Sequence, residues 1–361
     1  MTGLALEGVR VLEVGGGIPA AFAARWMAGY GAEVVRVETD GPLGPLSADE
    51  AVYLLAGKRR TAVDGWADVA DLAGFADIVI EDQAPGTLDV AALRAARPEL
   101  CVVSVTPFGQ SGPYAGYAVT NGVAFAMGGI MSLTGDIERT PLLTGGSAAF
   151  YLGGINAFTA ALMAYYGRLV HGEGDWVDLS LQECAAGMVE LYVPGTAYGQ
   201  PVQLRTGNHV RAVWGIYPCI DGWAGAFCLE RQIRGLFAAM DRPDLAADAR
   251  MNDPVQRATP ELDEELTAHV YAFFAGHTKA ELLDLARRHK VPIGVATTPA
   301  ELLDSPVLAA RGYFESVETG EGSTARVPGR PFPGLGWRPS GAVSAIGELA
   351  AVRSAWSGAG S

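Results

Sequence analysis

The sequence predicts an α/β protein that has a large domain built on a mostly parallel sheet and a smaller inserted α+β domain. Short β-rich runs alternate with helical stretches through the first half of the chain, and the composition changes after about residue 195. Strands that alternate with helices indicate βαβ units, in which the strands are parallel. The 361 residues, 49% of them hydrophobic, suffice for two domains that each bury a core.

The expected strands of the large domain consist mainly of Val, Ile and Leu, which is typical of strands buried on both faces. They lie at 9–14, 33–38, 77–81, 101–105 and 177–181, with helices expected near 66–75, 88–96 and 148–170. The last helix should end at His171–Gly172, because glycine after a helical run is a stop signal. In the small domain Asp221–Gly222 predicts a hairpin over 215–227, and 261–290 is expected to be helical.

The domain boundaries follow from loop-forming residues. A stretch rich in Gly, Pro and Asn at 196–212 predicts a linker, and a second one at 320–341 predicts the return to the large domain. We therefore expect a large domain at 1–195, completed by 326–361, and a small domain at 213–325.

The run from 148 to 166 carries no charged side chain and is almost long enough to span a membrane. Asn156, Thr159 and the Gly153–Gly154 pair lower its hydrophobicity, and no second such segment follows. We interpret it as a buried central helix, and we expect no membrane association.

Composition excludes several functions. The net charge of −14 leaves no basic surface for nucleic acid, although a small anion needs only a few local cations. The four cysteines form no CxxC pair, and the start of the chain lacks the pattern of a cleaved signal, so a cytoplasmic location is expected. The five histidines show no zinc-site spacing, so no metal is expected.

Gly15-x-Gly17-x-x-Ala20 lies between a strand and a helix, and Glu38 ends the next strand. This pattern resembles the fingerprint of dinucleotide-binding Rossmann domains, so the large domain is expected to be Rossmann-like. The pattern is weak, because glycines at a first βα turn often serve only a sharp backbone bend. Pro19 also removes an N–H that a phosphate would need. We therefore expect no NAD.

A series of motifs in fixed order resembles the family III coenzyme A transferases, which include formyl-CoA and carnitinyl-CoA transferases and the α-methylacyl-CoA racemases. The resemblance extends over nearly the whole chain. Its motifs are LEGVRVLEVGGG (6–17), GAEVVRVE (31–38), LLAGKRRTAVD (54–64), ADIVIEDQAPGTLD (76–89), RPELCVVSVTPFGQSGPYA (97–115), GGIMSLTG (128–135), GEGDWVDLSLQE (172–183), YPCIDGWAGAFCLERQ (217–232) and KVPIGVATTPAELLDSPVLAARGYF (290–314).

The resemblance implies a two-domain subunit that interlocks with a second copy into a dimer, with a coenzyme A thioester as substrate on the large domain. In the transferases an aspartate attacks the thioester carbonyl, whereas in the racemases a histidine and an aspartate move the proton next to it. The residues that it places near the coenzyme are Gly17, Ile18, Pro19, Lys58, Arg59, Asp82 and Gln83.

The chain departs from the family at the catalytic positions. Ser147 stands at the aspartate position, and no Asp or Glu occurs from 139 to 168. Asn121 stands within the racemase pair. Glu230 resembles a glutamate of the racemase cleft, and burial after an apolar strand would raise its pKa. Ser147, Asn121 and Glu230 are thus the candidate catalytic residues, with a helix cap as the alternative role of Ser147 and a surface position as that of Glu230.

Family arginines that hold phosphate are replaced by Thr39 and Val90, and Asp82 adds a carboxylate, so weak coenzyme binding is expected. Three functions stay open. The chain acts on an acyl-CoA or related acyl substrate without the aspartate, or it is a non-catalytic subunit paired with an aspartate-bearing homologue, or it is a scaffold that binds a small apolar ligand without coenzyme A.

Overall fold

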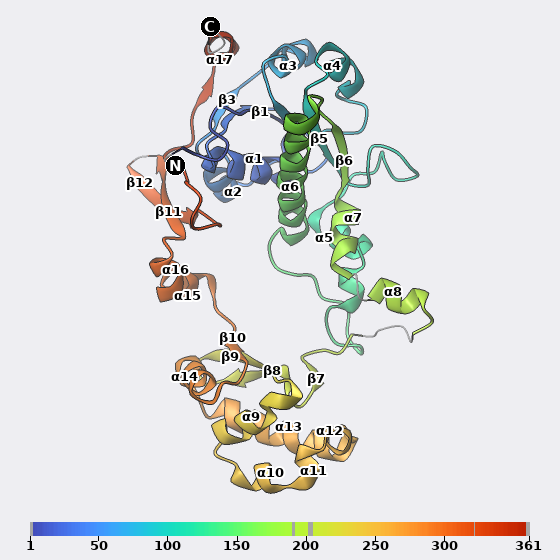
Figure 1. The fold of residues 1–361 in the computed structure, drawn as a ribbon, viewed down its shortest axis with the longest axis vertical. Helices are drawn as coiled ribbons and strands as arrows, with labels where there is room; N and C mark the ends of the chain where they lie inside the picture. The colour runs from blue at the N-terminus through green and yellow to red at the C-terminus, as the bar shows by residue number, and fades with distance from the viewer. Residues whose placement is uncertain (1–2, 190–191, 201–204, 321, 359–361) are drawn as a thin grey trace. The chain divides into compact units, whose positions relative to one another are not determined.

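The structure, a computed structural model, describes residues 3–189, 192–200, 205–320 and 322–358 (Figure 1). The chain forms two compact units. The first contains Met1–Met131, Leu143–Val202 and Leu303–Ser361, and the second contains Ser132–Leu142 and Gln203–Leu302. A separate core of buried hydrophobic side chains lies in each unit.

The first unit is built on a seven-stranded sheet in the order β13-β3-β2-β1-β4-β5-β6, and every neighbouring pair is parallel. The order 3-2-1-4-5-6 is that of the Rossmann fold, so the predicted parallel Rossmann-like domain is confirmed. The strands are β1 (Arg10–Val14), β2 (Glu33–Val37), β3 (Arg59–Thr61), β4 (Ile78–Glu81), β5 (Cys101–Thr106), β6 (Trp176–Ser180) and β13 (Ile346–Gly347). β3 and β13 were not predicted, because two or three residues give too short a pattern.

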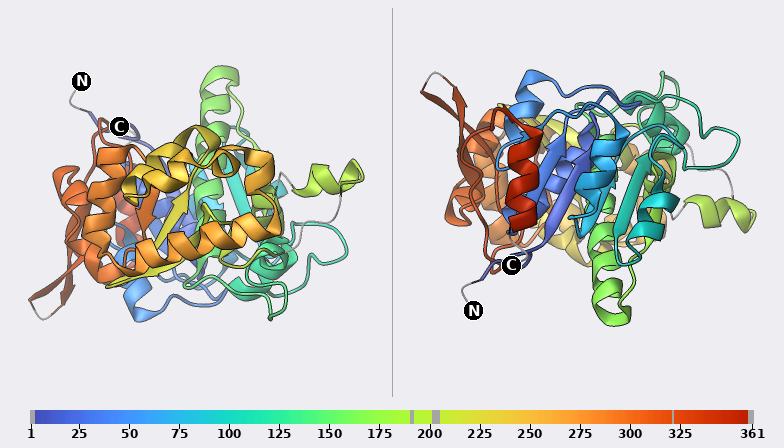
Figure 2. Two further views of the ribbon diagram at one scale, coloured as in Figure 1. Left: turned by 90° about the horizontal axis from the view of Figure 1, so that it is seen from below. Right: turned by 90° about the horizontal axis from the view of Figure 1, so that it is seen from above.

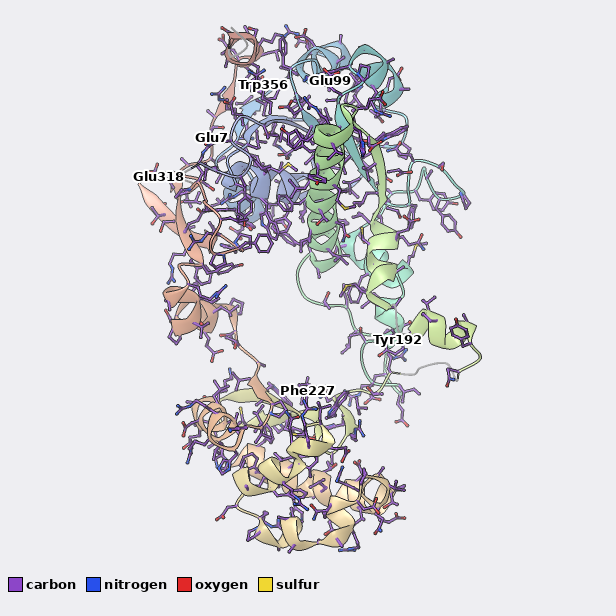
Figure 3. The ribbon with its side chains drawn as sticks, viewed as in Figure 1. Glu7, Glu99, Tyr192, Phe227, Glu318 and Trp356 are labelled. Atoms are coloured by element: carbon purple, nitrogen blue, oxygen red, sulfur yellow. The ribbon has the colours of Figure 1, made fainter. Side chains whose placement is uncertain are left out.

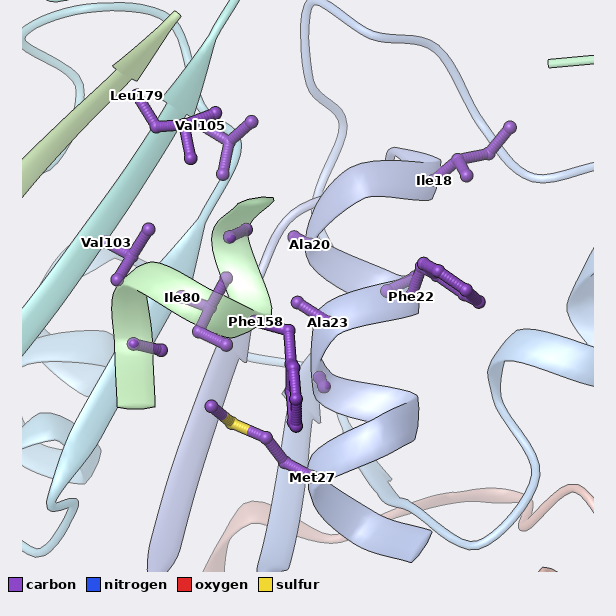
Figure 4. Close-up of a cluster of buried hydrophobic side chains, with 14 of the residues drawn as sticks. Ile18, Ala20, Phe22, Ala23, Met27, Ile80, Val103, Val105, Phe158 and Leu179 are labelled. Carbon is purple, nitrogen blue, oxygen red and sulfur yellow. The ribbon is translucent and has the colours of Figure 1, made fainter. Parts of the chain in front are cut away.

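Helices cover both faces of this sheet (Figure 2). α1 (Ile18–Gly29) and α6 (Ala148–His171) pack on one face, where Met27 and Phe158 lie toward Ile80 and Val103, whereas Phe22 lies on the side of α1 away from these strands (Figure 4). The other face is covered by α3 (Trp66–Ala73), α4 (Val90–Ala96) and α17 (Leu349–Gly358), which carries the Trp356 labelled in Figure 3. Successive strand residues point to opposite faces, so each strand contributes to both cores.

α6 packs closely against α1, because Gly154 leaves room for Phe22: a Cβ at Gly154 would lie 2.9 Å from the Cβ of Phe22. It ends as predicted, at Gly172 with φ of +84°. The helix is long and apolar enough to cross a membrane by length and composition. One face of α6 is buried, as expected of a core helix, whereas Met163 and Tyr166 on the other are 70% and 69% exposed.

The second unit has a four-stranded antiparallel sheet, β10-β9-β8-β7, with helices packed around it. The predicted hairpin is confirmed, since Cys219 of β8 pairs with Gly222 of β9. Phe227, labelled in Figure 3, ends β9. The elements are β7 (His209–Arg211), β8 (Trp214–Cys219), β9 (Gly222–Phe227), α9 (Ile233–Ala239), α10 (Pro243–Ala247), α11 (Ala249–Asn252), α12 (Pro254–Arg257), α13 (Pro260–Ala275), α14 (Lys279–His289) and β10 (Ile293–Val295).

The unit boundaries differ from the expected domain at 213–325. Residues from Leu303 onward belong to the first unit, where the hairpin of β11 (Phe314–Gly320) and β12 (Ser323–Pro328) is tied to α1 by a buried ion pair between Arg25 and Glu315. The expected linker at 196–212 begins in a helix, and its residues 201–204 lie outside the described residues. The remaining helices are α2 (Ala48–Leu54), α5 (Asn121–Met127), α7 (Leu181–Ala186), α8 (Tyr192–Ala197), α15 (Pro299–Leu303) and α16 (Pro306–Ala310), with short 3-10 turns at Ile130–Leu133, Gly187–Val189 and Glu230–Gln232.

Candidate functional site

A pocket of about 540 Å³ opens beyond the carboxyl ends of β1 and β2. This is the edge of a parallel sheet at which α/β proteins bind ligands. The lining includes Gly16 from the turn after β1, Thr39 and Gly41 from the turn after β2, and four charged residues, Arg36, Glu38, Asp40 and Arg60.

Neither cation in this pocket is free. The Arg60 guanidinium lies 2.5 Å from Glu38 Oε1, and Arg36 lies 3.1 Å from Glu38 Oε2. Arg36 also pairs with Glu13 of β1, which is fully buried. A guanidinium that already holds carboxylates attracts a phosphate less strongly than a free one, because the incoming anion must displace or repel them.

Lys58, which we expected at the edge of a coenzyme pocket, is buried instead. Its ammonium lies 2.5 Å from Glu13 Oε2 and 2.7 Å from the carbonyl oxygen of Ala21 in α1. Burial lowers the pKa of Lys58 to about 8 against the attraction of Glu13. Burial alone would raise the pKa of Glu13, but its pairs with Lys58 and Arg36 bring it below the usual value. Lys58 thus belongs to a buried ion cluster.

Asp82 occupies the space under the glycine loop. Its Oδ2 accepts a hydrogen bond from the backbone N–H of Gly17, the N-cap of α1, at 3.0 Å. A Cβ at Gly17 would lie 2.6 Å from that oxygen, and one at Gly15 would overlap Oδ1. The carboxylate therefore stands where a dinucleotide phosphate would meet the helix N-terminus. The glycine loop, whose sequence resembles the dinucleotide fingerprint, thus binds the chain's own Asp82 carboxylate.

The Asp82 carboxyl group is fully buried, and its Oδ1 has no hydrogen-bond partner among the described residues. Burial raises the pKa of Asp82 to about 7, and Glu13 and Glu81 add to this, whereas Arg36 and the Gly17 N–H oppose it. Burial also raises the pKa of Glu81 to about 7. Two buried carboxyl groups at the carboxyl end of β4, Glu81 and Asp82, therefore have pKa values raised to about 7.

The other predicted coenzyme residues do not line this pocket. Ile18 and Pro19 form the first turn of α1 and are buried. The Gln83 amide donates to the Thr39 hydroxyl at 3.1 Å, which places Gln83 behind the pocket wall. Arg59 is exposed on β3. Val90, at a family arginine position, is buried in the first turn of α4.

The cap predicted for Ser147 is wrong, because Asn121 provides it. Ser147 is the N-cap residue of α6 but makes no side-chain cap bond. The Asn121 Oδ1 instead accepts from the N–H groups of Ala149 and Phe150 at 2.9 and 3.4 Å, and its Nδ2 donates to the Gly146 carbonyl at 3.1 Å. An asparagine from a neighbouring helix thus satisfies donors that α6 leaves open.

Glu50, a carboxylate beside Ser147, was not predicted from the sequence. Glu50 Oε2 accepts from the N–H and the hydroxyl of Ser47, at 2.9 and 2.8 Å, in a capping box at the start of α2. The Ser147 hydroxyl approaches its other oxygen, Oε1, at 3.4 Å. No local pattern could find this pair, since 97 residues separate its members.

Glu230 lies in the second unit, whereas Ser147 and Asn121 lie in the first. The expected burial of Glu230 is not observed, because its side chain is 54% exposed. It forms an ion pair with the buried Arg257, which also donates to the Met251 carbonyl at 2.7 Å. Among the described residues, no group of three or more His, Cys, Asp or Glu could hold a metal.

Comparisons with known proteins agree on one family. A family model described as CoA-transferase family III matches residues 6–340. The chain is 31% identical to the succinyl-CoA–D-citramalate CoA-transferase of Chloroflexus aurantiacus, over 85% of this chain and 82% of that protein. It is 26% identical to the beta subunit of the succinyl-CoA–L-malate CoA-transferase of the same organism, over 96% and 91%.

A solved structure has the same fold. The crystal structure of a CAIB/BAIF family protein from Brucella suis superimposes with a TM-score of 0.83 at 27% identity, covering 98% of this chain and all of that one. The match of the family model over most of the chain, together with a relative above 30% identity, shows that this protein belongs to CoA-transferase family III.

Proposed function

We propose that this protein is a CoA-transferase-like enzyme that takes an acyl-CoA, or a related acyl substrate, and reacts without the aspartate nucleophile of its family. The observation that carries the proposal is the pocket of about 540 Å³ at the carboxyl ends of β1 and β2, in a chain of CoA-transferase family III. The resemblance places the coenzyme on this domain, near the glycine loop.

The charges around the pocket support weak binding of the coenzyme. Arg36 and Arg60 are already paired with Glu38, and Asp82 occupies the Gly17 N–H. In addition, Thr39 and Val90 are expected to replace two arginines that hold phosphate in the family. Losing these two charge-assisted contacts costs about 1.5–3 kcal/mol each, which corresponds to at least about a 100-fold loss of affinity for coenzyme A. We expect a dissociation constant for coenzyme A above the micromolar range.

Calorimetry with coenzyme A tests the binding step. Asp82→Asn should tighten binding, because an amide does not repel phosphate, whereas Asp89→Asn, at the exposed N-cap of α4, is the matched control. A dissociation constant at or below the micromolar range for the wild type would contradict the expected weakness. No binding by either the wild type or Asp82→Asn would favour the scaffold that binds a small apolar ligand.

For the reaction itself we propose the Ser147–Glu50 pair. Ser147 stands at the family's aspartate position, and Glu50 Oε1 lies 3.4 Å from its hydroxyl. In one route the Glu50 carboxylate attacks the thioester carbonyl, the C–S bond breaks, and an acyl anhydride and the coenzyme thiolate form. In the other, Ser147 attacks, its proton passes to Glu50, and an acyl ester forms with the same leaving thiolate.

Succinyl-CoA is the probe that separates these routes. Glu50→Gln should abolish turnover in both, whereas Ser147→Ala should abolish it only in the ester route, where mass spectrometry detects a succinyl ester on Ser147. Asp49→Asn, on the neighbouring exposed residue of α2, is the matched control. Glu230→Gln tests the remaining carboxylate, and if it alone stops turnover, the Ser147–Glu50 assignment is wrong.

The second candidate function is a non-catalytic subunit of a heteromeric enzyme. The name of one relative, a beta subunit of a CoA-transferase, favours it. In this case the protein would show no turnover alone and would gain it when mixed with an aspartate-bearing homologue.

We also propose that the protein is a dimer, with itself or with such a homologue. The supporting observation is the outer face of α6, where Met163, Tyr166, Leu169 and Val170 are 56–70% exposed. Apolar surface of this kind is typical of protein interfaces. A stable monomer at micromolar concentration in sedimentation experiments would contradict the proposal.

A further inference from the structure

The second unit contains a cavity of its own, of about 400 Å³, whose size is that of a small-molecule site. It lies among the segment 135–142, the turn before β7 and α13. The lining side chains that matter here are Asp136, Arg139, Leu142, Asn208, His209 and Tyr271.

The wall that carries Asp136 and Arg139 is held in place by backbone contacts. The Arg205 guanidinium donates to the carbonyl oxygens of Asp136, Ile137 and Arg139 at 3.0, 3.3 and 3.1 Å. The Gly207 N–H donates to the Gly135 carbonyl at 3.0 Å, and Asp136 forms a β-bridge with Thr206. Three bonds to one guanidinium therefore hold the backbone of the turn that carries these two charged residues.

Only one of these two side chains, that of Asp136, has a hydrogen-bond partner within the described part of the chain. Among the described residues, neither Asp136 nor Arg139 takes part in an ion pair, with the other or with a third group. Asp136 Oδ1 accepts from the Glu138 N–H at 3.0 Å, and Oδ2 has no hydrogen-bond donor in the described part of the chain. A guanidinium binds a carboxylate well, and a carboxylate oxygen accepts from a hydroxyl or an ammonium group.

The rest of the lining is uncharged. The rings of His209 and Tyr271 lie 5.3 Å apart, and burial lowers the pKa of His209, so this ring is neutral at pH 7. Leu142, which is 58% exposed, adds apolar surface. Asp136 would repel a second carboxylate, whereas a short apolar chain would contact the rings and Leu142.

We propose that this cavity binds a small monocarboxylate with a hydroxyl or ammonium group next to the carboxylate. Arg139 binds the carboxylate, Asp136 accepts from the hydroxyl or ammonium group, and Leu142 and the two rings contact the short carbon chain. As a binding site the cavity goes beyond the proposed function; only its use as an acceptor site in CoA transfer rests on that function.

Calorimetry on the full chain, without coenzyme A, tests the proposal with four probes: 2-hydroxyisovalerate, valine, isovalerate and malate. We expect a dissociation constant on the order of 1 mM for one or both of the first two, and the one that binds identifies the donor as hydroxyl or ammonium. Isovalerate, which lacks the donor, should bind at least about tenfold more weakly. Malate should also bind more weakly, because of its second carboxylate.

Two variants test the roles of the charged side chains in binding these probes. Arg139→Gln should weaken every probe at least about tenfold, whereas Asp136→Asn should weaken valine or 2-hydroxyisovalerate and strengthen malate. Arg287→Gln, on the exposed face of α14, is the matched control and should change nothing. Denaturant midpoints show whether each variant is folded.

Three results would overturn the proposal: no binding of any probe at roughly 10 mM, equal binding of isovalerate and its hydroxy derivative, or unchanged binding in folded Arg139→Gln. Because coenzyme A is absent from the assay, any of these results leaves the proposed function untouched. Conversely, binding here would stand even if the first unit bound no coenzyme.

Discussion

The pocket beside the glycine loop and the cavity beside Arg139 both contain arginine and carboxylate side chains. These charges are paired within the protein in the pocket, whereas in the cavity they form no ion pair among the described residues. In the first, Arg36 and Arg60 hold Glu38, and Asp82 holds the Gly17 N–H. In the second, Arg139 and Asp136 have no ion pair among the described residues. The charges that line a site therefore do not by themselves determine which ligand the site attracts. What matters is whether those charges are already paired within the protein.

Burial accounts for the difference. Glu13, Arg36 and Lys58 are buried, and a buried charge must be paired inside the protein because water cannot solvate it. Arg139 and Asp136 are exposed, so water solvates them until a ligand replaces it. Paired buried charges should therefore contribute to stability, and unpaired exposed charges to binding.

The largest expected effect is on the buried cluster. Glu13→Gln leaves Lys58 and Arg36 buried without the carboxylate between them, and should lower the free energy of unfolding by about 3–5 kcal/mol. Urea denaturation measures it. The control is Asp284→Asn, which breaks exposed pairs with Arg287 and Arg288 and should cost far less, because water screens these charges. Equal losses in both variants would remove the distinction between the two regions.

The next effect depends on pH. The folded pKa of Asp82, about 7, lies above its ordinary value of 3.8. Between these values the unfolded chain has released the proton while the folded chain holds it, so stability falls as the pH rises through this window and levels off above it. Asp82→Asn keeps no such proton. The free energy of unfolding of Asp82→Asn, minus that of the wild type, should therefore increase with rising pH by about 1.4 kcal/mol per pH unit within the window, up to about 4 kcal/mol in total.

Urea denaturation between pH 4 and 8 measures this difference. Glu81, whose pKa is also raised to about 7, is present in both proteins, so its own contribution largely cancels. A difference between Asp82→Asn and wild type that does not change with pH would mean that Asp82 stays ionised in the folded protein.

A smaller effect distinguishes two polar residues at one helix end. Asn121→Ala removes the acceptor of two α6 N–H groups and should cost about 1 kcal/mol, whereas Ser147→Ala should cost only a few tenths. Thermal unfolding compares the two variants. If Ser147→Ala is the more damaging, its hydroxyl caps the helix after all, and its role next to Glu50 is structural.

The smallest effect is expected at the second cavity. Arg139→Gln should change the free energy of unfolding by less than about 0.5 kcal/mol, because the exposed guanidinium has no partner among the described residues to lose. The same denaturation assay as for Glu13→Gln checks it. A loss of more than about 1 kcal/mol would mean that Arg139 supports the turn, as Arg205 does, and would weaken the contrast between the regions.

Strand and helix periodicity predicted most of the first unit. The runs that became β1, β2, β4, β5 and β6 are rich in Val, Ile and Leu, and the glycine at 172 marked the end of α6. Short polar strands such as Arg59–Thr61 were missed, because they are strands only through pairing with β2 and β13. The hairpin of β11 and β12 was missed within a glycine-rich stretch.

The candidate site could be predicted only in part. Motif order identified the family, and the absence of an acidic residue from 139 to 168 is visible in the sequence. Partners could not be predicted, because they come from distant parts of the chain. Lys58 was expected to face a ligand and faces Glu13, and Glu50 reaches Ser147 from 97 residues away.

The sequence by itself determined the parallel sheet, the glycine turn after β1 and the lack of spare positive charge, because these depend on local pattern and composition. Only the tertiary structure decided which charges are neutralised. It placed Asp82 under the glycine loop and Asn121 on the end of α6, and it left Arg139 unpaired among the described residues. The strength of an ionic group depends on its burial and on its neighbours within a few ångström, and folding alone sets both.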